Sequence, residues 1–366
     1  MIRDSAARGD ETGDLVSCHD AMVDEGLFHI LVPRELGGAN GTPRDWFDTV
    51  VTIAHAEPSA GWIMAQGPIQ TAFIAVAGDP DFAASFFSKR QAVASSSAGQ
   101  ATAERHGDGY LVHNARWAYT SGCQGAAYLG GAVRIISTDG TPESRIVLVP
   151  ADQATINRTW NTHGLRGTGR HHIDLGDEII IPAGHSLTWP HLTINRPGTL
   201  ANAITYSAWT ISVSTAAVNL GATRRALEAT TASAEHKMHR FDTVPVIVQS
   251  PFIRKIADLH GNIELAIAGL RRLLDELWEH AATGAPNAVE RARIRLAAAC
   301  AVETGATAVH EAQLLVGADA LHRSHPLERL GRDTQMLRTH GAVNPSTREQ
   351  LGNVLLDTYQ GPPDFI

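Results

Sequence analysis

Eight apolar residues between positions 252 and 277 recur at spacings of four or three, and this pattern constrains the fold more than any other in the chain. They are Phe252, Ile256, Leu259, Ile263, Ile267, Leu270, Leu274 and Leu277. Spacings of three and four place side chains on one face of an α-helix. The segment is therefore predicted to be one helix of about seven turns whose apolar face packs against other helices.

The rest of the chain divides into three parts by texture. Helical spacing before residue 91 gives way to short β-type runs up to about residue 192, broken by turns such as Asp108-Gly109, and helical texture returns after Pro197. We expect helices at 15–27, 46–55, 288–315 and 326–340 and strand segments at 110–113, 145–149 and 178–181. The predicted class is α+β, with domains at 1–90 (helical), 91–195 (antiparallel sheet) and 196–366 (four-helix bundle).

Composition and charge exclude several classes of protein. Of 366 residues, 43% are hydrophobic and 19% charged, as in an ordinary globular protein. A net charge of -8 and a pI near 6.1 argue against a nucleic-acid surface. The amino terminus is polar, and no apolar run approaches the length of a membrane span. The spacing of Cys18, Cys123 and Cys300 matches neither a disulfide framework nor a zinc site, so we expect a cytoplasmic protein.

Common catalytic and metal-binding motifs are absent from the sequence. It has no nucleophile elbow, no phosphate-binding P-loop, no His-Glu-x-x-His and no dinucleotide-binding glycine motif between a strand and a helix. His171 and His172 are neighbours on an expected strand and point to opposite faces, while no third ligand accompanies His322 and His325. We therefore expect no metal and no nicotinamide domain.

One glycine-rich segment and one distant histidine have the chemistry of a flavin site. Gly164-Leu-Arg-Gly-Thr-Gly-Arg170 reads as a bend between strands in which glycines, lacking a Cβ, let a planar ligand approach the backbone. His340 lies at the end of the last expected helix. A titratable imidazole next to a backbone cradle suits redox or proton-transfer chemistry.

A second segment, Arg116 to Cys123, offers a stacking surface followed by hydrogen-bonding groups. Trp117 and Tyr119 are two residues apart and precede Thr120, Ser121 and a glycine. These aromatic rings would stack on a ligand. The alternative is an ordinary strand that ends in a turn, with both rings in the core.

Five segments in one order resemble the acyl-CoA dehydrogenase superfamily, and within it the group D flavin-dependent monooxygenases, which are two-component hydroxylases. The segments are Leu31–Gly38, Glu57–Trp62, Trp117–Gly122, Trp160–Gly169 and Leu327–Asp333. The resemblance implies an N-terminal helical domain, a central antiparallel β-barrel-like domain and a C-terminal four-helix bundle, assembled as a homotetramer. It also implies a flavin, FAD or FMN, that binds between the β domain and the bundle.

The resemblance assigns roles to individual residues. The expected flavin contacts are Trp117, Tyr119, Thr120, Ser121, Gly122, Cys123, Thr168, Gly169 and Arg170. Gln313 and Gly317 would meet flavin from a neighbouring subunit, and Arg332 would touch a flavin phosphate. His171 and His172 would contact substrate.

His340 decides between the branches of the superfamily. Acyl-CoA dehydrogenases use a carboxylate near this place to remove a proton, whereas the monooxygenases use a histidine, and this chain has Thr339-His340-Gly341. We expect His340 to be a general base with a pKa near the working pH. Many oxygenases carry a serine after the Gly-Thr-Gly turn. Here Arg170 takes the place of that serine, and its side chain would stabilise an anion or would point to solvent.

The predicted function is a flavin-dependent monooxygenase that uses reduced FMN or FAD and O2 to oxygenate a small aromatic, polyketide-like or CoA-linked substrate. A separate flavin reductase would supply the reduced flavin, since no nicotinamide domain is recognisable. One alternative is an FAD-dependent acyl-CoA dehydrogenase whose base comes from elsewhere, such as Glu235. The other is a catalytically silent member of the fold that acts as a binding subunit.

Overall fold

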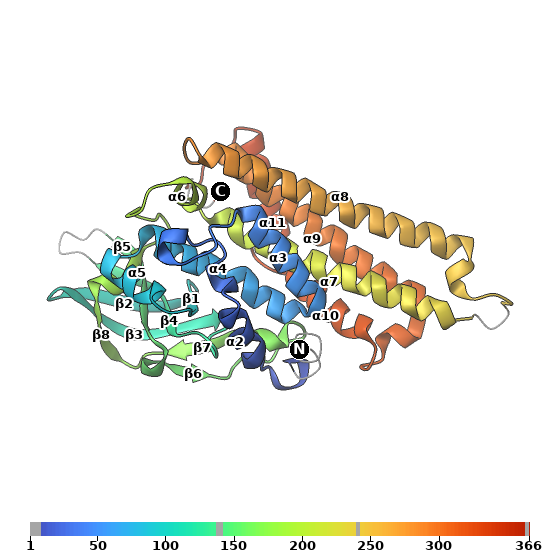
Figure 1. Ribbon diagram of the computed structural model, residues 1–366, viewed down its shortest axis with the longest axis horizontal. Coiled ribbons are helices and arrows are strands. Elements are labelled where there is room, and N and C mark those ends of the chain that lie inside the picture. Colours follow the sequence, from blue (N-terminus) through green and yellow to red (C-terminus); the bar gives the residue numbers. More distant parts are fainter. Residues whose placement is uncertain (1–8, 137–141, 239–241, 363–365) are drawn as a thin grey trace.

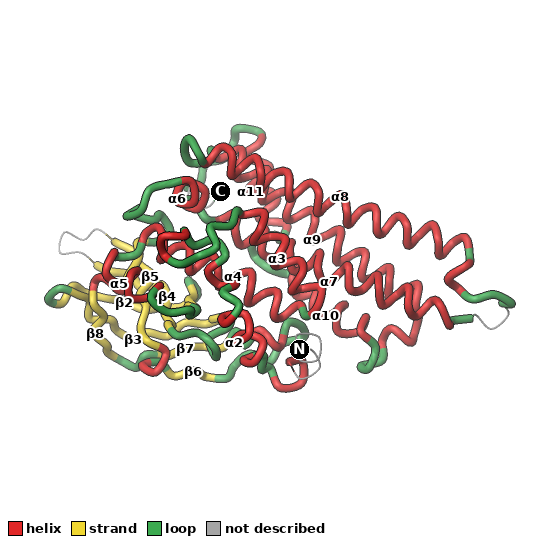
Figure 2. The backbone as a smooth tube through the Cα atoms, in the orientation of Figure 1, coloured by secondary structure: helices red, strands yellow, loops and turns green. Residues whose placement is uncertain are grey.

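The protein consists of one β-sheet and a set of helices that lie along one side of the sheet and continue beyond it (Figure 1). The computed structural model describes residues 9–136, 142–238, 242–362 and 366. Figure 2 shows the strands gathered at one end of the molecule and the long helices running away from them to the other. The class is mixed α+β, as the sequence predicted. Within the described ranges, no helix has the length and apolar character needed to cross a membrane.

The amino-terminal helices owe their boundaries to local capping chemistry. They are α2 (Val16–Asp24), α3 (Pro43–Ala56), α4 (Pro58–Ala77) and α5 (Pro80–Phe87). Thr42 and Asp45 form a reciprocal capping box at α3, and Pro43 occupies its first position. The Glu57 side chain caps α4 by accepting a hydrogen bond from Ser59 N. α4 is buried on most sides, between α3 and α7 and against β1.

The strands form one sheet of mixed pairing. They are β1 (Val93–Ser96), β2 (Gly99–His106), β3 (Gly109–Thr120), β4 (Tyr128–Ile136), β5 (Pro142–Pro150), β6 (Thr155–Asn157), β7 (His171–Asp174), β8 (Glu178–Pro182) and β9 (Ser186–Thr188). The order is β6-β7-β3-β2-β4-β5-β9, with β1 beside β4 and β8 beside β3. Pairing is antiparallel except that β1 and β2 both run parallel to β4. The expectation of a purely antiparallel sheet was therefore wrong, because the chain crosses over between these strands instead of folding into successive hairpins.

Long helices form the carboxyl-terminal part. They are α6 (Thr199–Ile204), α7 (Ala208–His236), α8 (Ser250–Ala281), α9 (Ala288–Val316), α10 (Pro326–Arg338) and α11 (Pro345–Leu355). Of the predicted stripe on α8, all but the half-buried Ile256 are buried. The helix predicted at 326–340 is α10, which ends at Arg338, two residues before the predicted end at His340. A further helix, α11, follows it, although the sequence did not suggest a helix there.

One buried carboxylate joins the glycine-rich bend to α10. Asp333, in the middle of α10, accepts a hydrogen bond from Leu165 N at 2.6 Å. It lies beside the guanidinium of Arg329, one turn earlier, which in turn contacts Glu57 Oε2 at 2.7 Å. Burial raises the pKa of Asp333 to about 6, against the opposing effect of Arg329. The bend, α10 and the start of α4 are thus held together by a buried hydrogen bond and a buried ion pair.

We predict that Asp333→Ala lowers the free energy of unfolding by about 1–3 kcal/mol, because it leaves the buried Leu165 N without its hydrogen-bond acceptor. Asp333→Asn, which keeps an acceptor oxygen, should cost less. The matched control is Asp319→Ala, because Asp319 is exposed and pairs with Lys237 at the surface. That change should cost less than about 1 kcal/mol. Urea unfolding followed by circular dichroism checks this ranking, and equal losses for Asp333→Ala and Asp319→Ala would contradict it.

Candidate active site

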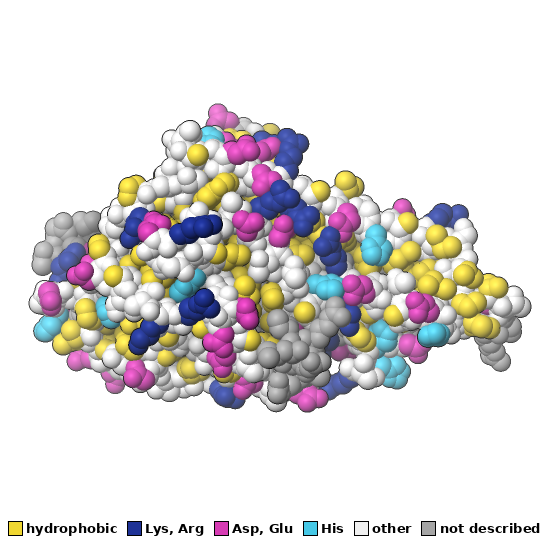
Figure 3. Space-filling view, in the orientation of Figure 1, with side chains coloured by type: hydrophobic (Ala, Val, Ile, Leu, Met, Phe, Trp, Pro, Cys, Tyr) yellow, Lys and Arg dark blue, Asp and Glu magenta, His cyan; other side chains and the backbone are white. Residues whose placement is uncertain are grey.

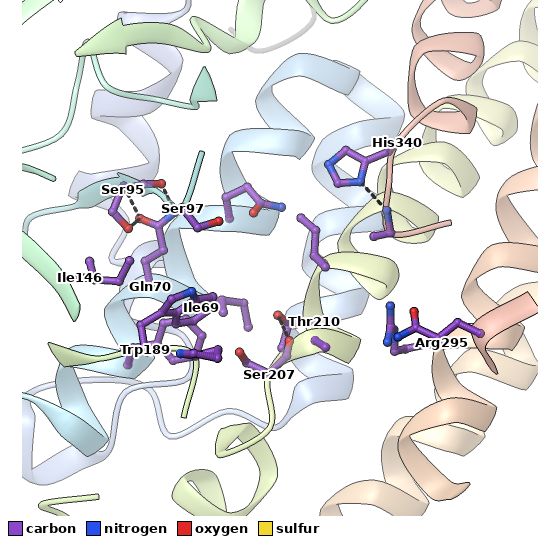
Figure 4. Close-up of a pocket in the computed structure, with 17 residues that line it drawn as sticks. Ile69, Gln70, Ser95, Ser97, Ile146, Trp189, Ser207, Thr210, Arg295 and His340 are labelled. Atoms are coloured by element: carbon purple, nitrogen blue, oxygen red, sulfur yellow. Dashed lines mark hydrogen bonds between the residues drawn. The ribbon is translucent and has the colours of Figure 1, made fainter. Parts of the chain in front are cut away.

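A cavity of about 530 Å³ lies where α4, the sheet and the carboxyl-terminal helices meet (Figure 4). Its apolar wall includes Ile69, Phe73, Ile146 and Trp189. Its polar groups come from elements far apart in the sequence, and include Gln66, Gln70, Ser95, Ser97, Ser207, Thr210, Arg295, His340 and Gln350. A ring-sized apolar cavity with a few converging polar groups is typical of a small-molecule site.

Two glutamines of α4 supply amides to this cavity. Gln70 Oε1 accepts hydrogen bonds from Ser95 N at 2.7 Å and from Ser95 Oγ at 3.2 Å, so its orientation is fixed by β1. Gln66 lies one helical turn earlier, and its buried Nε2 has no hydrogen-bond partner within the described part of the chain. A buried donor left without a partner is costly, which indicates that Gln66 serves a bound ligand.

His340 lies in the turn after α10 and lines the cavity from above in Figure 4. Its Nδ1 accepts a hydrogen bond from Ala342 N at 3.2 Å, so in the neutral ring the proton belongs to Nε2. Burial, together with the positive charge of Arg170, lowers the pKa of His340 to about 4. The expected pKa near the working pH was therefore wrong: His340 is a neutral imidazole at pH 7.

A second cavity, of about 370 Å³, shares His340 with the first. Arg170 occupies its wall, with its guanidinium carbon 5.1 Å from the ring centre of Trp160, 5.3 Å from that of Tyr119 and 5.4 Å from that of Trp62. Burial lowers the pKa of Arg170 to about 10, so it stays a cation at neutral pH. Its Nε has no hydrogen-bond partner among the described residues. Three aromatic faces hold this cation, which is available to an anion.

A bulge in β3 separates the two aromatic residues of the predicted stacking surface. The register with β7 shifts between Trp117 and Thr120, and Tyr119 adopts φ 64°. Tyr119 therefore turns outward, 49% exposed, to the second cavity. Trp117 packs in the core of the sheet and donates from Nε1 to Ala132 O at 2.7 Å. A stacking role for the Trp117 ring does not agree with this placement, because the ring is enclosed by the protein.

The turn after β3 is bound to the bend and to α4. Ser121 Oγ accepts a hydrogen bond from Trp62 Nε1 at 2.9 Å, and Gly122 N donates to Thr168 O at 3.0 Å. Thr120 is buried, and its Oγ1 has no partner in the described ranges. Cys123 donates from Sγ to Gly169 O, and burial raises its pKa to about 11, so it is an unreactive thiol.

The glycines of the bend lie close to other parts of the protein. A Cβ on Gly164 would lie 2.4 Å from Arg332 O, and one on Gly167 would lie 2.9 Å from the Leu15 side chain. A Cβ on Gly169 would lie 2.5 Å from Gln124 Oε1. The bare backbone is thus needed at Gly164 for contact with α10 and at Gly167 for contact with Leu15, whereas the approach of a ligand to the bend stays a prediction.

The two histidines that follow the bend differ in exposure. His171 is buried, and its Nδ1 accepts a hydrogen bond from Trp160 N at 3.2 Å. Burial lowers its pKa, as does nearby Arg158. His172 is exposed and lies 6.1 Å from Tyr119 between ring centres. Neither lines the two cavities that share His340.

Gln313 and Gly317, expected to meet flavin from a neighbouring subunit, and Arg332, expected to touch a flavin phosphate, lie away from His340. Gln313 and Arg332 line a cavity of about 540 Å³, and Gly317 follows α9 with φ 74°. Arg332 pairs with Asp10 at 2.8 Å and Glu328 at 2.9 Å, and these partners raise its pKa. Its charge is therefore already balanced within the chain.

Sequence reasoning missed the polar wall of the first cavity. Gln66 and Gln70 are four residues apart in an otherwise apolar helix, a signal that could have marked a polar face within the core. Arg295 gave no such signal, because it follows Arg291 and Arg293 in a helix rich in arginine. Glu235, the alternative base, is exposed at the far end of α7.

Comparison with known proteins confirms the resemblance. The family described as "Acyl-CoA dehydrogenase, C-terminal domain" matches residues 213–345. The indole-3-acetate monooxygenase of Pseudomonas putida is 26% identical over 91% of this chain and 85% of that protein. The HsaA oxygenase subunit of a flavin-dependent monooxygenase from Rhodococcus jostii is 26% identical over 92% of this chain and 91% of that protein.

Solved structures share the fold. XiaF from Streptomyces sp., in complex with FADH2 and glycerol, gives a TM-score of 0.85 at 22% identity and covers 97% of this chain and 92% of its own. TdsC from Paenibacillus sp. A11-2, with FMN and indole, gives 0.84 at 19% identity and covers 100% of this chain and 96% of its own. These likenesses support the arrangement of helices and sheet seen here.

We predict a pH-dependent difference in stability between the protein and a His340→Gln variant. A folded pKa of about 4 lies below the ordinary value of 6.5, so unfolding takes up a proton in the window between them. The native protein should therefore lose stability relative to the variant as pH falls below 6.5, by about 2 kcal/mol at pH 5. Urea unfolding at pH 7, 6 and 5 measures this, and parallel pH profiles for the two proteins would contradict it.

Proposed function

We propose that this protein is a flavin-dependent monooxygenase that acts on a small aromatic substrate. Residues 213–345 match the acyl-CoA dehydrogenase C-terminal domain family, and the chain is similar over nine-tenths of its length to flavin-dependent monooxygenases. One oxygen atom of O2 enters the substrate, and the other leaves as water with two electrons from the reduced flavin. The observation that carries the proposal is that a half-buried, neutral His340 joins a ring-sized apolar cavity to one that holds Arg170.

The residues present fit a flavin. An isoalloxazine is a flat aromatic ring with hydrogen-bonding edges, and it becomes an anion when reduced. The unpartnered donors Gln66 Nε2 and Arg170 Nε and the buried hydroxyl of Thr120 suit such a group. A bound reduced flavin supplies the electrons that activate dioxygen.

Individual residues take the following proposed roles. Arg170 stabilises the negative charge of a bound group and lies beside Tyr119, Thr120, Ser121 and the turn that follows. Gln313 and Gly317 contact flavin across a subunit boundary, and Arg332 contacts a flavin phosphate. His171 and His172 line neither cavity that shares His340, so they contact a part of the substrate that lies outside both. His340 exchanges a proton with the substrate oxygen. In the neutral ring Nε2 carries the proton, so accepting a proton from the substrate requires the other tautomer, in which the hydrogen bond from Ala342 N to Nδ1 is lost. The lowered pKa makes His340 a weak base.

An aromatic substrate suits the shape and lining of the first cavity. Phe73 and Trp189 stand 6.0 Å apart between ring centres, and Ile69 and Ile146 complete the apolar wall. A flat ring can pack against these side chains at little cost in lost hydrogen bonds. Relatives are named for indole-3-acetate and resorcinol, both of them aromatic.

The remaining features of the proposal concern cofactor form, partners and organisation. Either FAD or FMN would serve, since related structures contain FADH2 or FMN, and relatives named as oxygenase subunits or components favour a separate flavin reductase. We propose a cytoplasmic protein with domains at 1–90, 91–195 and 196–366. A homotetramer would cover exposed apolar side chains such as Val244, Val248, Ile253 and Leu265. Figure 3 shows apolar side chains gathered near the right-hand end of the molecule.

The dehydrogenase alternative needs a carboxylate base beside the substrate. The described residues that line the two cavities sharing His340 include no aspartate or glutamate. Nothing in this lining favours removal of a proton next to a thioester, and the monooxygenase proposal is preferred.

We predict that the purified protein, given reduced FMN or FAD, O2 labelled with 18O and an indole or phenol, forms a product containing one labelled oxygen. His340→Ala should lower the rate of product formation about 100-fold or more, because proton transfer to a positioned side chain is lost. His260→Ala, an exposed change on α8, is the control and should keep the rate. Mass spectrometry of the product measures both.

The alternatives give different results in the same assay. Full product formation by His340→Ala would remove His340 from the reaction. Bleaching of a bound flavin by an acyl-CoA without oxygen would identify a dehydrogenase. The absence of both reactions would identify a binding subunit.

A further inference from the structure

The wall of the first cavity includes an amide whose orientation is fixed by the protein. Gln350, on α11, lines the cavity, and its Nε2 donates a hydrogen bond to Tyr359 Oη at 2.9 Å. Tyr359 is not among the described residues that line this cavity. Burial lowers the pKa of Arg295 and nearby Tyr359 raises it, so Tyr359 lies behind the end of the cavity that Arg295 lines. The amide nitrogen of Gln350 is therefore directed away from the cavity.

The hydroxyl of Tyr359 excludes the reverse orientation of this amide. Tyr359 Oη donates to Pro362 O at 3.2 Å. A carbonyl oxygen can only accept, so this bond uses the one proton of the hydroxyl. Toward Gln350 the hydroxyl can then only accept, and the atom that faces it must be the amide nitrogen. The chain also passes close to the hydroxyl at Gly361, where a Cβ would collide with it.

The oxygen of the same amide is left for a ligand. Gln350 Oε1 has no hydrogen-bond donor within the described ranges. The Gln350 side chain is half-buried, and its Oε1 is accessible rather than enclosed. An amide oxygen is an acceptor with two lone pairs and cannot donate. It can therefore pair only with an N–H or O–H group of the molecule that fills the cavity.

Neighbouring polar groups of the cavity are engaged differently. Arg295 can only donate, and Thr210 gives its hydroxyl proton to Ser207 O at 2.7 Å. Gln70 Oε1 already accepts two hydrogen bonds from β1. Gln350 Oε1 is thus an acceptor that the protein orients and leaves available in an otherwise largely apolar space.

We propose that Gln350 Oε1 accepts a hydrogen bond from the substrate, so that the protein selects aromatic compounds with an N–H or O–H donor over compounds of the same shape without one. The proposal rests on the proposed function in taking the first cavity as the substrate site. It makes Gln350 a specificity-determining residue and Tyr359 the residue that positions it. A ring without a donor would cover Oε1 and leave it without a hydrogen bond, which weakens binding.

The test compares aromatic compounds of nearly equal shape. Binding of indole and benzofuran, and of phenol and fluorobenzene, is measured by titration calorimetry with the intact protein, with and without FMN. Indole and phenol carry a donor, whereas benzofuran and fluorobenzene do not. In at least one pair the donor compound should bind about 5- to 50-fold more tightly, as expected when a buried acceptor is otherwise left unpaired.

Variants locate the source of this preference. Gln350→Met removes the amide at similar side-chain length and should abolish the preference, whereas Gln350→Glu keeps an acceptor oxygen and should keep it. Tyr359→Phe removes the hydroxyl that orients the amide and should reduce the preference, although Tyr359 does not line the cavity. The matched control is Gln153→Met, an exposed change in the short helix Ala151–Gln153, which should leave the preference intact.

The proposal is overturned if neither donor compound binds more tightly than its isostere, or if Gln350→Met or Tyr359→Phe keeps the preference in full. Circular dichroism identifies a variant that does not fold, in which case the pairs with the native protein and with Gln350→Glu decide the question. Failure of the proposed function gives a different result. A preference for donors without any oxygenated product would retain the role of Gln350 and reject the monooxygenase, and oxygenation of indole and benzofuran with equal binding would do the reverse.

Discussion

Two buried contacts position the segments of the candidate site: the ion pair of Glu57 with Arg329 and the hydrogen bond from Leu165 N to Asp333. Glu57 caps α4, Arg329 and Asp333 belong to α10, and Asp333 also holds the backbone of the bend at Leu165. Burial raises the pKa of Glu57 to about 7, while Arg329 opposes that rise. A buried ion pair is costly to separate, and a buried N–H is costly to leave without an acceptor, so the three segments keep one relative position.

That position determines which side chains meet. α4 carries Trp62, Gln66 and Gln70, α10 leads into His340, and the bend leads into Arg170. Each of these side chains belongs to a segment fixed by these contacts, and together they line the two cavities on either side of the imidazole. His340 and Arg170 are 170 residues apart in the sequence, yet the charge of Arg170 lowers the pKa of His340.

The helices could be predicted from the sequence because their signal is local. The spacing of apolar residues from Phe252 to Leu277 needed only one helix face, and α8 buries it as expected. Pairing in the sheet depends on contacts between distant segments, so the parallel partners of β4 did not show in the strand texture. The same limit applies to the bend, where Gly164 is required by the backbone of α10 and Gly167 by the side chain of Leu15. The candidate residues His340 and Arg170 could be chosen from the sequence, whereas the lowered pKa of His340 follows from burial that only the fold creates. Arg295 could not be chosen at all, because its importance comes from the wall it shares with α4 and α7.

The wall of the first cavity draws on residues from Gln66 to Gln350, which is nearly the whole length of the chain. During synthesis on a ribosome, the amino-terminal helices and the sheet emerge long before the turn at His340 and helix α11. A nascent chain therefore has no complete first cavity until Gln350 has left the ribosome. A ligand of this cavity can stabilise the protein only after that point.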